Sequence, residues 1–159
     1  MRLELRALLS RLAIPTIVVT HDFDDARVLG DRIAAMRLGA IVQVGTADAL
    51  AKSPEDAFVA ALTGTNFIGM TDGDGRRGIA FDPWQAHLGS PPGDATLQWR
   101  GEVVDVRPLG AHARVTLRAG ETDVRVDVDA EPGATGFRVG DVVVAWVPES
   151  AVRLVRNAP

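Results

Sequence analysis

The residues best suited to chemistry follow an apolar run near the start of the chain. His21 comes directly after residues 16–20, Thr-Ile-Val-Val-Thr, and the carboxylates of Asp22, Asp24 and Asp25 come behind it. Open α/β sheets commonly bind ligands where a buried strand meets a helix. There, a neutral imidazole can donate a hydrogen bond to a phosphate oxygen or orient a water molecule. The alternative is that His21 only packs at the strand end, with Asp22 capping the helix. The residues by themselves leave both interpretations open.

A metal site at this histidine is not expected. Consecutive residues on a strand or helix point in different directions, so these neighbouring ligand types do not converge. No second histidine lies at the i+4 spacing of a helical zinc site, and the chain has no cysteine. It also has no G-x-S-x-G turn and no G-x-x-x-x-G-K-[ST] phosphate loop, and its single lysine is Lys52. We therefore expect these residues alone to build neither a metal site nor a nucleotide cradle.

The other candidate side chains are scattered over the second half of the sequence. His87 and His112 are isolated and are predicted to lie at the surface or in turns. Four strand arginines could line an oxyanion site or form a solvated face: Arg107, Arg114, Arg118 and Arg125. Three tryptophans are expected to pack in a core or at strand edges: Trp84, Trp99 and Trp146.

Composition places the chain among globular proteins of one ordinary or two small domains. It has 159 residues, 47% of them hydrophobic and 24% charged. The net charge of −4, with scattered basic residues, argues against nucleic-acid binding, which needs a concentrated basic face. The first residues lack the pattern of a signal peptide, and no apolar run approaches the roughly 20 residues that span a bilayer. These features fit a cytoplasmic protein.

Residues 1–64 alternate helical and strand patterns. Leucines at helical spacing predict a helix over 3–12, and the β-branched run at 16–20 predicts a strand covered on both faces. A helix is expected from Asp22 to a left-handed cap at Gly30, followed by a hairpin over 32–45 that turns near Gly39. Short helices are expected at 46–51 and 54–62, the second capped by Ser53. This part is therefore predicted to be α/β.

After Gly64 the pattern changes to short strands separated by Gly, Pro and Asp, which is typical of a small barrel or sandwich. Strands are predicted at 79–82, 96–107, 112–118, 122–128 and 141–147. Two similar segments, 80–86 and 145–151, each place a proline where a strand should end and a turn or short helical segment begin. We place the boundary between the two parts at residues 63–68.

The order of elements in residues 1–64 resembles that at the end of the ATPase domain of an ATP-binding-cassette (ABC) transporter subunit. The matching text is IPTIVVTHD at 14–22, GDRIA at 30–34, GAIVQVGT at 39–46 and SPE at 53–55. In that family Thr-His-Asp forms the H-loop, whose histidine contacts the γ-phosphate of ATP and helps to position the attacking water. The resemblance therefore assigns His21 as the catalytic switch residue.

The remainder, residues 65–159, resembles the TOBE domain, an oligonucleotide-binding-like (OB-like) barrel attached to importer ATPases for molybdate, sulfate, iron, polyamines and sugars. The supporting text includes NFIG at 66–69, GIAFDP at 78–83, GEVVDV at 101–106 and VGDVVV at 139–144. Asp82 and Trp84 depart from the family's usual Arg-Pro-Glu turn. Such domains are generally regulatory or ligand-sensing, and nucleic acid is not implied.

The resemblance also implies cofactors and partners. The family's phosphate loop, signature motif and magnesium segment have no counterpart in this sequence. We therefore expect ATP and magnesium to act in a complete subunit, and this chain neither to bind ATP tightly nor to hydrolyse it. Expected partners are a second copy in a homodimer and the membrane permease of an importer, with the subunit at the cytoplasmic side of the inner membrane. The alternative function is a small-oxyanion (molybdate-like) binding module or a dimerisation module. An unpaired strand at 16–20 would also favour self-association.

Overall fold

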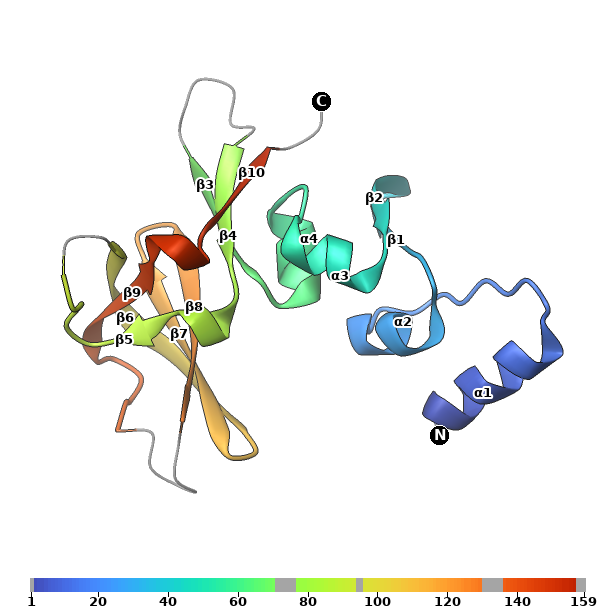
Figure 1. Ribbon diagram of the computed structural model, residues 1–159. Coiled ribbons are helices and arrows are strands. Elements are labelled where there is room, and N and C mark those ends of the chain that lie inside the picture. Colours follow the sequence, from blue (N-terminus) through green and yellow to red (C-terminus); the bar gives the residue numbers. More distant parts are fainter. Residues whose placement is uncertain (1, 71–76, 94–95, 130–135, 157–159) are drawn as a thin grey trace.

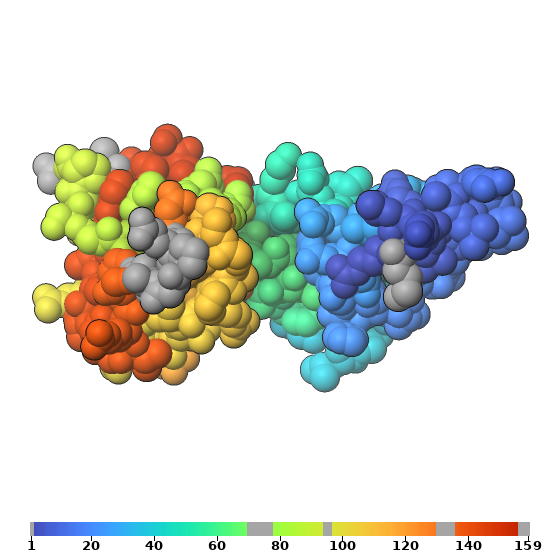
Figure 2. All heavy atoms as spheres, turned by 90° about the horizontal axis from the view of Figure 1, so that it is seen from below, coloured from blue at the N-terminus to red at the C-terminus, as the bar shows by residue number. Residues whose placement is uncertain are grey.

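The computed structural model describes residues 2–70, 77–93, 96–129 and 136–156. Helices α1 to α4 and the β1–β2 hairpin lie on one side of the molecule, and the remaining strands form a barrel-like unit on the other (Figure 1). The space-filling view shows the same elongated arrangement, with the N-terminal residues farthest from the strands (Figure 2). No helix in the described ranges is long and apolar enough to cross a membrane.

The N-terminal elements are α1 (Arg2–Leu12), α2 (Phe23–Leu29), β1 (Ile33–Arg37), β2 (Ala40–Gly45), α3 (Ala47–Lys52) and α4 (Ala57–Thr63). All of them except α1 contribute residues to a small apolar cluster. The buried members of the cluster are Ile33, Ala35, Leu50 and Val59. As predicted, the hairpin turns at Gly39, whose φ of +81° favours a residue without a side chain.

The predicted strand at 16–20 is wrong. These residues are irregular and exposed, with Ile17 at 94% and Val19 at 93% of their full accessibility. A strand needs a neighbour to satisfy its backbone groups, and nothing in the described part of the chain pairs with this segment. The β-branched side chains of this segment are therefore exposed and have no neighbouring strand to cover them in the described part of the chain.

Two helix boundaries also differ from the prediction. Gly30 ends α2 in an extended conformation, with φ −99°, because the chain continues directly toward β1. The fourth helix is capped by Asp56, whose Oδ1 accepts from Val59 N at 2.9 Å, and Ser53 instead ends α3. The side chain of Gln43 holds the intervening loop by bonding Ser53 O at 2.9 Å and Glu55 N at 3.0 Å. These bonds keep 53–55 out of the helix.

The second part is all-β and OB-like, as predicted, with two antiparallel sheets. Its strands are β3 (Asn66–Met70), β4 (Arg77–Phe81), β5 (His87–Leu88), β6 (Thr96–Leu109), β7 (His112–Ala119), β8 (Thr122–Asp129), β9 (Val142–Pro148) and β10 (Arg153–Arg156). The sheet orders are β10-β4-β3 and β5-β9-β6-β7-β8. Alternating residues of β7 and β8, such as Val115, Leu117, Val124 and Val126, are fully buried in one core with Phe81.

The two predicted proline corners are confirmed. After β4 the chain enters the 3-10 turn η1 (Pro83–Gln85), and after β9 it enters η2 (Glu149–Ala151). The strands that flank the two corners pair with each other crosswise. β4, which enters the first corner, pairs with β10, which leaves the second, and β9, which enters the second corner, pairs with β5, which leaves the first. Arg153 in the second corner also forms an ion pair with Asp82 in the first, at 3.3 Å. Asp82, which departs from the usual family turn, therefore ties the two corners together.

A core substitution tests the packing of the barrel. Leu117→Ala removes a fully buried side chain and should lower the free energy of unfolding by about 2–5 kcal/mol. Leu154→Ala, at a leucine that is 78% exposed, should change it by less than about 0.5 kcal/mol. Urea denaturation followed by circular dichroism measures both, and equal effects would contradict the described core.

The cap of α2 predicts a specific acid sensitivity. Asp22 Oδ1 accepts from Asp24 N at 2.8 Å and from Asp25 N at 3.2 Å. The Asp25 N–H is the largest cause that holds the pKa of Asp22 below its ordinary value, with the Asp24 N–H and Arg2 contributing in the same direction. A lowered folded pKa means that this stabilisation is present above the unfolded value near 4 and is lost as pH falls through the folded one.

We therefore expect the Asp22 carboxyl carbon to titrate below the unfolded value in an NMR pH series, and α2 amides to lose protection over the same range. The Asp22→Asn variant keeps a good cap residue without a titrating group, so its α2 signals should not show this acid transition. An Asp22 titration at or above the unfolded value would refute the cap.

Candidate functional site

His21 lies exposed at the end of the irregular segment, immediately before the Asp22 cap of α2. The acids that follow it serve the fold. Asp22 caps the helix and accepts from Arg2 Nη2 at 3.1 Å, and Asp25 also forms an ion pair with Arg2. Among the described residues, no group of three or more potential metal ligands gathers anywhere. Asp24, which is also exposed, pairs with Arg27 at 3.0 Å, so among His21, Asp22, Asp24 and Asp25 the exposed imidazole is the side chain to which the described structure gives no partner. Asp22 fixes the backbone next to it.

Helix α1 holds this region through its arginines. Arg2 makes the contacts described above. Arg6 donates from Nη1 to Val28 O near the end of α2, and its Nη2 lies 3.7 Å from Asp31 Oδ1. These ion pairs are largely exposed, so each contributes little stability. They connect α1 to α2 and place positive charge beside Asp22 and Asp25.

The structure does not bring the four strand arginines together into an oxyanion site. Arg114 makes a bidentate pair with Asp127 at 2.7 and 2.8 Å, and the Asp127 side chain is fully buried. This hydrogen bonding raises the pKa of Arg114 above its ordinary value despite partial burial. The other three are engaged separately: Arg118 with Asp123, Arg107 with Asp105, and Arg125 with the carbonyl of Thr65.

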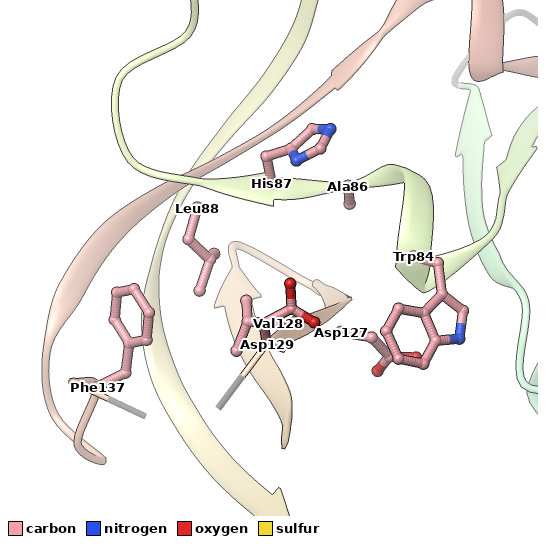
Figure 3. Close-up of a pocket in the computed structure, with 8 residues that line it drawn as sticks. All are labelled: Trp84, Ala86, His87, Leu88, Asp127, Val128, Asp129 and Phe137. Atoms are coloured by element: carbon pink, nitrogen blue, oxygen red, sulfur yellow. The ribbon is translucent and has the colours of Figure 1, made fainter. Parts of the chain in front are cut away.

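A pocket of about 340 Å³ opens beside β5 and β8. Its lining, drawn in Figure 3, is Trp84, Ala86, His87, Leu88, Asp127, Val128, Asp129 and Phe137. The polar side chains of this wall are Trp84, His87, Asp129 and the fully buried Asp127, and none of the four arginines belongs to it. An anionic ligand would meet the exposed carboxylate of Asp129 and no arginine, so the pocket does not suit an oxyanion.

The groups around the pocket already have partners in the fold. Asp127 is bound by Arg114, and Asp129 contacts His112 Nδ1 at 2.9 Å. His87 packs against the Trp146 ring at 4.3 Å between centroids. The sequence pattern Val-Asp-Val-Asp at 126–129 indicated a strand with a polar face, but it carried no signal that this face borders a pocket.

The isolated histidines and tryptophans lie mainly as expected. His87 is exposed, and His112 begins β7 beside a turn. Trp99 stacks on Phe81 at 5.3 Å in the core, and Trp146 covers His87. Trp84 differs, because it is 53% exposed and its ring meets the His112 ring edge-on at 4.5 Å on the pocket wall.

Comparison with known proteins supplies the family. Residues 79–155 match the TOBE domain family. An sn-glycerol-3-phosphate import ATP-binding protein of Vibrio vulnificus is 30% identical over 92% of this chain and 45% of its own length. A xylose/arabinose import ATP-binding protein of Haloferax volcanii is 33% identical over 97% of this chain and 47% of its own length. The chain thus spans less than half the length of these relatives.

Among the solved structures, a cytoplasmic molybdate-binding protein with molybdate bound aligns with 52% of this chain and 62% of its own, at 21% identity and a TM-score of 0.45. That similarity is too low to support an argument about the fold or a ligand. The TOBE match and the importer relatives carry the assignment. They place a TOBE domain in the second half of the chain and show that nearly the whole chain is similar to the ATP-binding subunits of importers.

Proposed function

We propose that this chain supplies the γ-phosphate switch and the TOBE domain of the ATP-hydrolysing subunit of an importer. The observation that carries the proposal is the position of His21. Its side chain is exposed between an uncovered apolar segment and a capped helix, and Asp22, which follows it, is committed to the helix cap. An imidazole in this position is available to a ligand held by other parts of a subunit.

Residues 1–64 act in this proposal as the end of an α/β ATPase domain, and residues 65–159 as the TOBE domain. Ile17 and Val19 are nearly fully exposed β-branched residues of the kind found in buried strands. Neighbouring strands of the ATPase sheet would cover them and would thereby set the position of the adjacent His21. ATP and magnesium would be bound by loops that this sequence does not contain.

The chemistry assigned to His21 is limited to its own atoms. One ring N–H of the imidazole donates a hydrogen bond to a γ-phosphate oxygen, and this contact signals that triphosphate is present. Magnesium bound elsewhere in the complete subunit would supply positive charge to offset the developing phosphate charge. The subunit would work as a homodimer at the cytoplasmic face of the membrane, attached to a permease.

A chimera tests the switch. The whole 159-residue chain replaces the matching 45% of the Vibrio vulnificus glycerol-3-phosphate import subunit, and phosphate release is measured with magnesium and ATP. His21→Ala should lower turnover by about 100-fold or more, because the loss of one positioned hydrogen-bond donor to developing negative charge costs about 10²–10³-fold, while ATP binding persists. The isolated chain provides the background and should show no magnesium-dependent turnover.

His112→Ala is the matched control, since it removes a histidine that contacts only barrel residues in the described structure. Its turnover should stay close to that of the unaltered chimera. Equal losses in the two variants, or full activity of His21→Ala, would remove the basis for the switch assignment.

The geometry of the barrel predicts that one chain does not bind small oxyanions tightly. The four arginines are engaged within the fold, and the exposed charged group of the pocket wall is the carboxylate of Asp129. Titration calorimetry of the chain with molybdate, tungstate and sulfate should therefore give no saturable heat. Specific micromolar binding of one of them would instead favour the alternative function, an oxyanion-binding module.

A further inference from the structure

The connection between the helical part and the barrel looks flexible in sequence and is buried in the structure. Residues 63–66 read Thr-Gly-Thr-Asn, a composition that suits a linker. Gly64 ends α4 with a φ of +80° and turns the chain toward the barrel. Thr65 and Asn66, which follow, are 2% and 0% exposed. A polar segment this deeply buried requires partners for its hydrogen-bonding groups.

Asn66 finds its partners on β8. Its Nδ2 donates to Arg125 O at 2.7 Å, and its Oδ1 accepts from Arg125 N at 2.8 Å. The carboxamide thus binds both backbone groups of one residue, as a paired strand would. In the described residues β3 and β8 belong to different sheets, so this side chain links the two sheets where no backbone ladder does.

Thr65 is bonded on both sides of the connection. Its hydroxyl donates to Ala51 O in α3 at 3.1 Å, and its carbonyl accepts from Arg125 Nη2 at 2.5 Å. One residue is therefore tied at the same time to the helical part and to the barrel. Both bonds are largely shielded from water, which makes their loss costly.

Arg125 completes the arrangement with a partly buried cation. Burial lowers the pKa of its guanidinium, and the nearby charge of Arg114 adds to that effect, while Asp127 and Asp123 oppose it. The bidentate pair of Arg114 with Asp127 keeps Arg114 in its own position. The guanidinium of Arg125 therefore donates to Thr65 O even though its partial burial costs free energy.

We propose that Thr65, Asn66 and Arg125 form a rigid joint that fixes the TOBE domain relative to α3 and α4. A movement of the helical part is then passed to the TOBE domain as a whole and is not absorbed by a flexible connection. The fixed orientation stands on the contacts alone, whereas its use in signalling from the His21 switch rests on the proposed function.

Pulsed electron paramagnetic resonance distances test the joint in the full chain. The protein has no native cysteine, so Asp48→Cys on α3 and Gln98→Cys on β6, both exposed, give two unique spin-label sites. The unaltered joint should give one narrow distance distribution. Arg125→Met and Thr65→Val should each widen it by about twofold or more, as expected when a connection becomes a flexible linker.

Thr65→Val removes the hydroxyl bond to Ala51 and leaves the barrel's own bonds in place, so it stays informative if Arg125→Met does not fold. The matched control is Arg118→Met, the same substitution at an exposed pair with Asp123, and its distribution should remain narrow. Near-ultraviolet circular dichroism establishes that each variant is folded. Widening in at least one folded joint variant, with a narrow control, supports the joint.

A broad distribution in the unaltered chain, or a narrow one in every folded joint variant, would overturn the proposal. The distances are measured without nucleotide, so the result is independent of the His21 chimera. The distance measurements can therefore support the joint while the chimera shows no effect of His21→Ala, and the reverse result is equally distinguishable.

Discussion

The carboxamide of Asn66 is the contact on which the architecture depends most. It is completely buried and bonds both backbone groups of Arg125, which lies 59 residues further along the chain. Without it, an N–H and a C=O on β8 would lose their partner in a nearly dry environment, as would the amide itself. The same contact brings Thr65 and the guanidinium of Arg125 together. One short segment therefore unites the two sheets of the barrel and connects the barrel to the helices.

The polar side chains of the barrel are used mainly to fix strands and corners. The Arg114–Asp127 pair lies across β7 and β8, and the Asp82–Arg153 pair joins the two proline corners. A buried ion pair such as Arg114–Asp127 adds little net stability against an apolar alternative, but the loss of one partner is costly because a charge remains unpaired. These pairs explain why arginines that could have formed an anion site do not form one in a single chain.

The N-terminal residues show the opposite situation, in which apolar surface has no cover. Ile17 and Val19 are exposed within a segment that lacks a neighbouring strand in the described chain, and His21 follows at its end. The proposed function assigns the cover of this segment to neighbouring strands of an ATPase sheet, which would also set the position of His21.

Patterns of short range were sufficient to predict much of this protein from its sequence. Alternating valines identified β8, the two prolines marked the corners, Gly39 located the hairpin turn, and the text around His21 indicated the family. Tertiary structure alone decided which groups meet across long separations. It paired Asn66 with Arg125 and Arg114 with Asp127, and it left 16–20 irregular. Local patterns report the preference of a backbone, whereas the pairing of buried polar groups depends on which distant partner satisfies each donor and acceptor.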